Sequence, residues 1–311
     1  MLFGALNDRT RLRILSLVER GELAVGEIAS LLEQSQPRIS RHVRILEEAG
    51  LVDRRREGSW VFVRLAQTRA VRALGTLFAQ LPRHPDDAAE VAADRARLGA
   101  IQEERAAAAQ RYFAAHAETW DSIRSLHVAE EEVEDAIIRV LHKRRLGHLL
   151  DLGTGTGRMA AILAPQATRV TAIDRSPEML RVARSRIAAD GEQVVDLKLG
   201  DLRALPLADA SVDSVVMHQV LHFLDEPDRA IAEAARVLTG GGHLLIVDFA
   251  PHDREELRRE AAHVRLGFSD GQIRGWFAAS GLLLEKSEEL KGAALNVKLW
   301  LGRRRSDGDG I

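Results

Sequence analysis

The sequence contains no cysteine among its 311 residues. Disulfide bonds, metal sites built on thiolates and a cysteine nucleophile are therefore all excluded. No apolar run approaches the roughly 18 residues that a membrane-spanning helix needs. The N-terminus also lacks the apolar core and the small-residue cleavage site of a signal peptide. We therefore expect a cytoplasmic protein.

Lysine is absent from the first 81 residues, which carry thirteen arginines against nine acidic residues, a net charge of +4. Since the whole chain has a net charge of −2, the remaining residues carry −6. The planar guanidinium group of arginine suits phosphates and guanine edges. A chain of this length, with 46% apolar residues, can also form two domains with separate cores.

The first 65 residues predict the order helix, helix, turn, helix, hairpin. Apolar residues recur at helical spacing from Leu6 to Arg20, from Val25 to Leu32 and from Gln36 to Glu48. Two alternating segments then flank Glu57-Gly58 between Leu51 and Leu65, which indicates a tight hairpin turn. This order is typical of a winged helix-turn-helix.

The next segment predicts one more helix, from Arg69 to Leu81, followed by a linker from Pro82 to Asp87. The stretch from Ala88 to about Ser125 is rich in alanine and charge, so it favours a long helix. That helix is either a solvated connector or a dimerisation helix. We therefore expect a winged-helix domain over residues 1–81, a linker and connecting helix over 82–128, a second domain over 129–303 and a tail over 304–311.

From Glu130 onward, helices alternate with short apolar strands, which predicts a parallel sheet covered by helices. The expected strands are His148–Leu152, Arg169–Asp174, Val194–Leu199, Val212–Met217 and His243–Asp248. Two further strands, Leu282–Glu288 and Ala293–Leu301, have only a turn around Lys291-Gly292 between them. A parallel sheet that ends in such an antiparallel hairpin favours a methyltransferase fold over a nicotinamide-binding one. Residues 303–311 are expected to be disordered.

The predicted helix from Gln36 to Glu48 has the features of a DNA-reading helix, with an apolar stripe on one side and polar side chains on the other. Arginine can read guanine and glutamine can read adenine. Three arginines before the turn at Gly58 place cations on a projecting ribbon suited to phosphate or minor-groove contact. The candidate DNA-contacting residues are Ser35, Gln36, Arg38, Ser40, Arg41, Arg44, Arg54, Arg55 and Arg56.

Residues 6–65 resemble the arsenic-repressor (ArsR) family of winged-helix regulators. The matching stretches are LNDRTRLRILSLVERGELAVGEIASLL, SQPRISRHVRILEEAGLV and RRREGSWVFVRL. The resemblance implies a homodimer that binds palindromic operator DNA and usually represses. His42 follows the family pattern and is added to the DNA-binding set, with a packing or phosphate-contacting role as its simplest reading. Many relatives have a Cys-containing metal motif where this chain has ELAVGE, Glu22 to Glu27, so soft-metal sensing at that place is excluded.

A glycine-rich turn, from Gly153 to Gly157, stands between a predicted strand and a predicted helix. Such glycines let the backbone approach a ligand closely at the positive end of a helix. The spacing G-x-G-x-G after Asp151 differs from the dinucleotide-binding G-x-G-x-x-G. Asp174 closes the next strand, where a carboxylate can accept hydrogen bonds from both ribose hydroxyls. Asp201 follows the third strand and is placed to accept from an adenine amino group.

Residues 110–303 resemble the class I S-adenosylmethionine-dependent methyltransferases. The matching stretches are RYFAAHAETWD, LLDLGTGTGRM, VTAIDRSPEML, GDLRALPLADASVDSVVMHQVLHFLDEP and AARVLTGGGHLLIVDF. The resemblance implies an α/β fold with a Rossmann-like seven-stranded sheet, and S-adenosylmethionine or S-adenosylhomocysteine as the ligand. The ligand-binding residues that it implies are Tyr112 as a cap, Gly153 and Gly155 at the methionine part, Asp174 at the ribose, Asp201 and Leu202 near the adenine, His218 in the pocket wall, and Asp151 and Met179 within the matching motifs.

No motif identifies a catalytic group. Methyl transfer from a sulfonium can proceed largely by positioning. The weak candidates for a base or substrate clamp follow strand ends and are His218, His222, Asp248 and His252. DNA methylation is disfavoured, because the chain has no cysteine nucleophile and has Met217 to Val220 in place of the Pro-aromatic motif of amino-group methylation.

Two functions therefore stay open at this point. The first is a DNA-binding regulator, most simply a repressor, whose second domain senses an S-adenosyl ligand. The second is a working methyltransferase of a small molecule with an attached autoregulatory DNA-binding domain. A cavity with an active base would favour the enzyme, and a cavity closed over the sulfur would favour the sensor.

Overall fold

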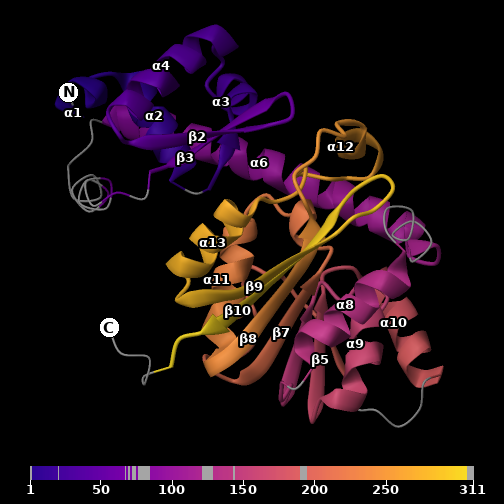
Figure 1. The fold of residues 1–311 in the computed structure, drawn as a ribbon. Helices are drawn as coiled ribbons and strands as arrows, with labels where there is room; N and C mark the ends of the chain where they lie inside the picture. Colours follow the sequence, from indigo (N-terminus) through magenta and orange to yellow (C-terminus); the bar gives the residue numbers. More distant parts are fainter. Residues whose placement is uncertain are drawn as a thin grey trace. The chain divides into compact units, whose positions relative to one another are not determined.

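The computed structural model describes residues 2–19, 21–66, 68, 71, 75, 85–120, 129–142, 144–189 and 195–306 (Figure 1). The chain divides into two compact units, unit 1 (residues 1–107) and unit 2 (residues 108–311). Nearly all of the helix predicted over residues 69–81 lies outside the described residues, as do residues 82–84 of the predicted linker. Within the described ranges, no helix has the length and apolar character needed to cross a bilayer.

Unit 1 has the winged-helix order that the sequence predicts. Its elements are α1 (Leu2–Leu6), α2 (Arg9–Val18), β1 (Leu23–Ala24), α3 (Val25–Leu31), α4 (Gln36–Glu48), β2 (Val52–Glu57) and β3 (Trp60–Leu65). The three strands form an antiparallel sheet in the order β1-β3-β2. Asp8 caps α2 by accepting a hydrogen bond from the backbone N–H of Arg11 at 3.0 Å. The fold prediction for this part of the chain is confirmed.

Helix α6 (Pro85–His116) starts three residues earlier than expected and ends nine residues earlier. Proline is compatible with the first turn of a helix, so Pro85 begins the helix where the sequence suggested a linker. The first part of α6 packs in unit 1, where Leu98 is buried in the core. The carboxylate of Asp94, 2% exposed, accepts hydrogen bonds from Nε and Nη2 of Arg13 at 2.6 and 2.7 Å.

Unit 2 is a doubly covered α/β fold. Its helices are α8 (Glu130–Leu141), α9 (Arg158–Leu163), η1 (Ala164–Gln166), α10 (Pro177–Ala189), η2 (Leu221–Phe223), α11 (Pro227–Val237), α12 (Glu256–Glu260) and α13 (Asp270–Ala279). Its strands are β4 (His148–Leu152), β5 (Arg169–Asp174), β6 (Val195–Leu199), β7 (Val212–His218), β8 (Leu238–Phe249), β9 (Leu282–Leu290) and β10 (Val297–Arg304). Figure 1 shows α11 and α13 on one side of the sheet and α8 and α9 on the other.

The sheet has seven strands in the order β6-β5-β4-β7-β8-β10-β9. All neighbours are parallel except β10, which is antiparallel to both β8 and β9. The expected Rossmann-like seven-stranded class I fold, with its terminal antiparallel hairpin, is therefore confirmed. Because β4, β5 and β7 are parallel neighbours, the loops that follow them gather at one edge of the sheet.

The hairpin differs in detail from the expectation. Strand β9 continues to Leu290, and β10 begins only at Val297 instead of Ala293. Arg303 and Arg304 belong to β10, so their predicted disorder is wrong. The Nη1 group of Arg304 donates to the carbonyls of Ala235 and Arg236 at 2.7 and 2.8 Å, near the end of α11. Because Arg304 satisfies carbonyls at the end of a helix, it orders this segment. The composition of the segment does not reveal this contact.

We expect Asp94→Ala to destabilise unit 1 by about 3–5 kcal/mol, because it leaves the mostly buried Arg13 guanidinium without its carboxylate. Urea titration read by hydrogen exchange of the α2 amides measures this loss. The matched control is Glu19→Ala, since Glu19 is 54% exposed and pairs with Arg95 of α6 at 3.2 Å; its expected cost is about 0–1 kcal/mol. Equal losses in the two variants would contradict the buried pairing.

Candidate functional site

The glycine-rich turn of unit 2 lies between β4 and α9, as the sequence predicts. Gly153, Gly155 and Gly157 all have positive φ angles, of 72°, 54° and 78°. A Cβ atom on Gly153 would lie 2.4 Å from Cγ2 of Val220, which follows β7. Glycine is therefore needed at position 153 both for the backbone conformation and for the close approach of the neighbouring loop.

Asp174, at the end of β5, holds this turn in place. Its Oδ2 accepts a hydrogen bond from the N–H of Gly155, and its Oδ1 accepts one from the N–H of Ser176, each at 2.8 Å. Burial raises the pKa of Asp174 even though both N–H groups act to lower it. A carboxylate has about four lone-pair positions, so Asp174 keeps acceptor capacity toward the pocket that it lines.

A pocket lies beside the turn, at the ends of β4, β5 and β7. Seven of the expected ligand-binding residues line it: Asp151, Gly153, Gly155, Asp174, Met179, Leu202 and His218. The remaining wall includes Ala109 and Phe113 of α6, together with Trp120, Arg175 and Phe223. The structure thus brings together residues from segments that are far apart in the sequence.

Three aromatic side chains, of Phe113, Trp120 and Phe223, close the pocket; we call them the aromatic cap. The ring centre of Phe113 is 4.8 Å from that of Phe223 and 5.2 Å from that of Trp120. The indole lies over the glycine turn, since a Cβ atom on Gly155 would be 3.7 Å from its Nε1. The space left has a volume of about 70 Å³, whereas ligand pockets usually measure roughly 300–1,000 Å³. We therefore expect a nucleoside-sized ligand to displace part of the aromatic cap.

Two expected ligand contacts are not in the pocket wall. Tyr112 packs its ring 4.4 Å from that of His116, and the next residue, Phe113, takes the capping position. One residue along a helix turns the side chain by about 100°, so the motif located the segment but not the side chain. Asp201 instead binds Arg203, with Oδ2 accepting from Nη2 at 2.8 Å. This hydrogen bond holds the pKa of Asp201 below its usual value.

Of the four catalytic candidates, His218 is the one in the pocket wall. His222 and Asp248 are buried and bind each other, with 2.7 Å between Nδ1 and Oδ1. Asp248 also accepts the backbone N–H groups of Leu221 and Phe249, at 3.0 and 2.7 Å. This pair therefore holds η2, which carries Phe223, rather than facing the pocket. His252 accepts a hydrogen bond from the N–H of Arg254 and is also absent from the wall.

Helix α4 of unit 1 presents the side chains expected of a reading helix. Ile39, Val43 and Leu46 are fully buried. The exposed residues on its opposite side and at its start are Ser35, Gln36, Arg38, Arg41 and Arg44, and Ser40 is half-buried. His42 is mostly buried, and this burial lowers its pKa. Its Nδ1 lies 3.7 Å from the carboxylate of Asp8, which fits a packing role.

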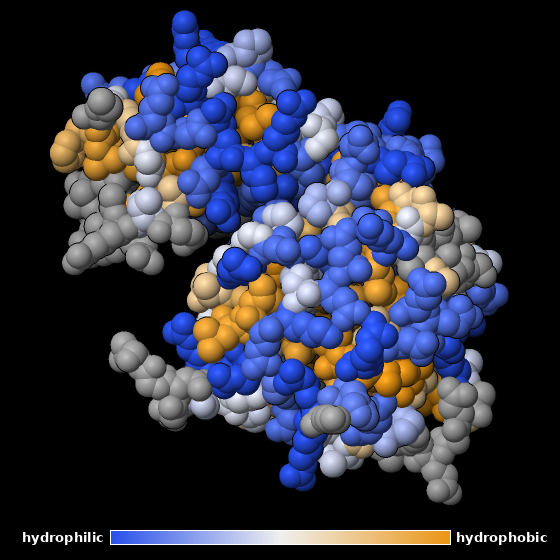
Figure 2. All heavy atoms as spheres, in the orientation of Figure 1, coloured by the Kyte–Doolittle hydropathy of each residue, from blue (hydrophilic) through white to orange (hydrophobic). Residues whose placement is uncertain are grey.

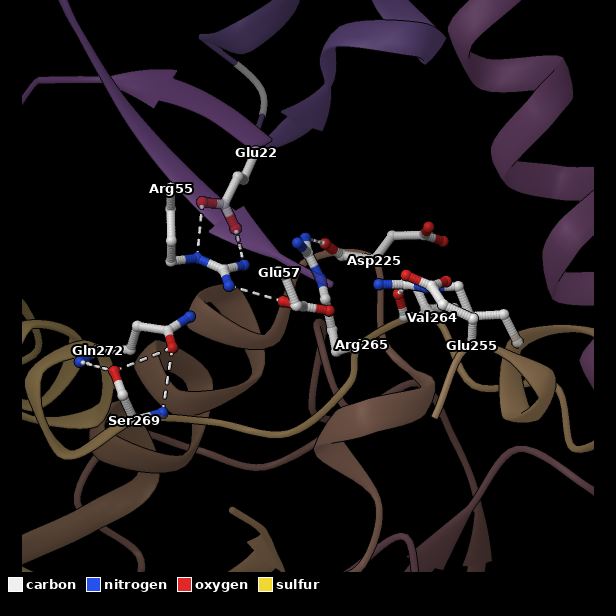
Figure 3. A network of polar contacts seen from close by, with 10 residues as sticks. Glu22, Arg55, Glu57, Asp225, Glu255, Val264, Arg265, Ser269 and Gln272 are labelled. Carbon is white, nitrogen blue, oxygen red and sulfur yellow. Dashed lines mark hydrogen bonds and ion pairs between the residues drawn. The ribbon is translucent and has the colours of Figure 1, made fainter. Parts of the chain in front are cut away.

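The three wing arginines do not share one face. Side chains alternate along a strand, so Arg54 and Arg56 of β2 are exposed while Arg55 points the other way. Figure 3 shows Arg55 between Glu22 and Glu57, with guanidinium to carboxylate distances of 3.0 and 2.6 Å. Because the charge of Arg55 is paired inside unit 1, we propose that Arg54 and Arg56 carry the DNA contacts of the wing in place of the three arginines expected.

Comparison with known families identifies two segments of the chain. Residues 8–54 match the model of bacterial regulatory proteins of the arsR family, and residues 150–246 match the model of a methyltransferase domain. Both resemblances drawn from the sequence are thus confirmed.

Curated relatives match part of the chain. It is 37% identical over 153 residues to a malonyl-[acyl-carrier protein] O-methyltransferase of Methylococcus capsulatus, covering 47% of this chain and 53% of that protein. It is 40% identical over 103 residues to a ubiquinone/menaquinone biosynthesis C-methyltransferase of Rubrivivax gelatinosus, covering 33% of this chain and 39% of that protein. The chain therefore spans only about two fifths to one half of the length of these relatives.

Solved structures share the fold. A putative methyltransferase of Bacillus halodurans superposes with a TM-score of 0.51 at 20% identity, over 56% of this chain and 99% of that one. The YcgJ protein of Bacillus subtilis gives a TM-score of 0.51 at 21% identity, over 57% of this chain and all of that one. At this level of identity the likeness shows the fold alone.

We expect the affinity for S-adenosylhomocysteine to fall as the pH drops through the raised pKa of Asp174, because a protonated carboxyl loses acceptor capacity for the ribose hydroxyls. Asp201 stays ionised in that range, since its pKa is lowered. Calorimetric titrations should show a pH dependence that Asp174→Asn removes. Asp174→Ala should weaken binding about tenfold or more, as charge-assisted hydrogen bonds contribute roughly 1.5–3 kcal/mol each.

The matched control for these titrations is Asp196→Asn, a carboxylate on β6 that pairs with Arg169 and does not line the pocket. It should keep both the affinity and the pH dependence of the unchanged protein. A pH profile that survives in Asp174→Asn would assign the titration to another group.

For the reading face, we expect Arg41→Ala to reduce affinity for a duplex selected by the protein from a random pool by about 1–3 kcal/mol. Replacing Arg54 and Arg56 together by alanine should lower the slope of log affinity against log salt by about 2, through lost phosphate contacts. Arg55→Ala, on the same strand, should leave this slope unchanged. A slope that falls equally in Arg55→Ala would contradict the assignment of the outward face.

Proposed function

Because the chain carries an ArsR-family helix-turn-helix and a class I methyltransferase domain, we propose that it is a DNA-binding transcription regulator that senses an S-adenosyl ligand. The ligand, S-adenosylmethionine or S-adenosylhomocysteine, binds the pocket beside the glycine-rich turn. Operator DNA binds α4 and the outward face of the wing, and the resemblance to the ArsR family makes repression the expected mode.

The observation that carries this proposal is the double role of α6. Leu98 of this helix is buried in the core of unit 1, and Phe113 of the same helix belongs to the aromatic cap in unit 2. A ligand that moves the aromatic cap therefore acts on a helix that the DNA-binding unit needs for its own packing.

A second function, methyl transfer to a small molecule, has its own support. The curated relatives named above are methyltransferases, and His218 lies in the pocket wall with an imidazole that can act as a base. Against it, His222 and Asp248 are committed to each other and to backbone N–H groups. Methyl transfer by positioning alone remains compatible with this pocket.

The regulator is expected to act as a homodimer on palindromic DNA. Figure 2 shows apolar areas among the hydrophilic side chains of the visible face. Among the described residues, the exposed large apolar side chains are those of Phe3 (80%), Leu12 (37%) and Leu199 (61%), on α1, α2 and β6. Phe3 and Leu12 belong to two successive helices of unit 1, and the homodimer itself is what the resemblance to the ArsR family implies.

We expect S-adenosylhomocysteine and S-adenosylmethionine to change the DNA affinity of the full chain unequally, because only S-adenosylmethionine carries the sulfonium charge and the methyl group. The measurement is a titration of the selected duplex at constant salt, with each ligand at saturation and with none. Three identical curves would exclude sensing. If the curves are identical and a labelled methyl group of S-adenosylmethionine is transferred to an acceptor, the methyltransferase function is favoured.

A further inference from the structure

Glu27 makes two different contacts with one carboxylate. Its Oε2 accepts a hydrogen bond from the backbone N–H of Ala24 at 2.7 Å, which caps the start of α3. Its Oε1 forms an ion pair with Arg105 of α6. The Glu27 side chain is only 13% exposed, so water competes little for this carboxylate. The same group therefore fastens α6 to the first turn of the helix-turn-helix.

This pair, which we call the α3–α6 latch, borders the surfaces that read DNA. Glu27 and Arg105 line a cavity of about 490 Å³ in unit 1. Its other walls include Gln36 of α4, Arg54 of β2 and Trp60 of β3. The latch thus lies beside both the reading helix and the wing, in the ELAVGE segment that has no cysteine for metal sensing.

The same helix carries the latch and the pocket wall. Arg105, Ala109 and Phe113 are spaced four residues apart, so they lie along one side of α6. At 1.5 Å per residue, Arg105 and Phe113 are separated by about 12 Å along the helix axis. Ala109 and Phe113 line the pocket with a free volume of about 70 Å³, in which we expect a nucleoside-sized ligand to displace part of the aromatic cap. Any rotation or shift of α6 that makes room for a ligand also moves the guanidinium of Arg105.

We propose that the α3–α6 latch couples ligand binding in unit 2 to the DNA-reading surface of unit 1. This inference rests on the proposed sensing function and names the residues that would carry it. When Phe113 yields to an S-adenosyl ligand, Arg105 moves with α6. The carboxylate of Glu27 then either follows Arg105, which releases the N–H of Ala24, or loses its partner. Both outcomes change the start of α3 and the cavity wall shared with α4 and the wing.

The test compares Glu27→Gln and Arg105→Ala with the unchanged full chain. Glutamine at position 27 keeps an oxygen for the N–H of Ala24 but loses the ion pair, so the cap of α3 is retained. The matched control is Arg95→Ala, because Arg95 is also on α6 and pairs with Glu19 of unit 1 at 3.2 Å. Affinity for the selected duplex is measured with and without saturating S-adenosylhomocysteine at constant salt.

We expect the ligand to shift the DNA affinity of the unchanged protein by about 5- to 150-fold, the usual range of coupling. The shift should disappear in Glu27→Gln and Arg105→Ala and persist in Arg95→Ala. By reciprocity, the DNA should change ligand affinity by the same factor in each protein. Calorimetry with the ligand alone should show binding in all four proteins, because neither latch residue lines the ligand pocket. Glu27→Gln and Arg105→Ala should bind at least as tightly as the unchanged protein, since the ligand no longer has to disrupt the latch.

The outcomes separate the two proposals. A shift that persists at full size in Glu27→Gln and Arg105→Ala overturns the latch and leaves the sensing function in place. The absence of any shift in the unchanged protein overturns both. As a second readout without DNA, the ligand should change hydrogen exchange of the amides of residues 24–31 in the unchanged protein but not in Glu27→Gln. An identical change in both proteins also overturns the latch.

Discussion

Helix α6 has to satisfy two packing requirements at once. Its first half is held in unit 1 by the buried contact between Asp94 and Arg13 and by Leu98 in the core. Its last turns supply Ala109 and Phe113 to the pocket of unit 2. A helix is stiff along its axis, since every interior backbone group is hydrogen-bonded within it. We propose that a displacement at one end is passed along the helix, and both the proposed sensing and the α3–α6 latch depend on this transmission.

The pocket depends on a second constraint, which is the meeting of parallel strand ends. The carboxylate of Asp174 joins the end of β5 to the glycine turn after β4, and the loop after β7 approaches so closely that position 153 must be glycine. Around this backbone arrangement, the buried pair of His222 and Asp248 holds the short helix that carries Phe223. The polar side chains that look catalytic in the sequence thus include two that keep the aromatic cap in position.

Much of the fold was predictable because it follows from local patterns. Helical periodicity, the turn at Glu57-Gly58 and the alternation of helices with apolar strands predicted both domains and the antiparallel hairpin at the end of the sheet. Seven of the nine expected ligand-binding residues line the pocket, because glycines and carboxylates at strand ends must lie near one edge of a parallel sheet. The expected residues whose side chains the structure turns elsewhere are those whose role depends on side-chain direction. Tyr112 and Phe113 are neighbours on a helix, and Arg54 and Arg55 are neighbours on a strand, so within each pair the side chains point in different directions.

By itself, the sequence determined which elements form, in what order, and at which strand ends polar groups gather, because these depend on residues close together in the chain. The tertiary structure alone decided which charges are free to meet a ligand or DNA. Asp201 accepts a hydrogen bond from Arg203, and Arg55 forms ion pairs with Glu22 and Glu57. Glu27 binds both the backbone N–H of Ala24 and the guanidinium of Arg105. Pairing depends on distances of a few ångströms between side chains, many of them on different elements. Glu22 and Arg55, like Glu27 and Arg105, are far apart in the chain, so only the folded packing brings these partners together.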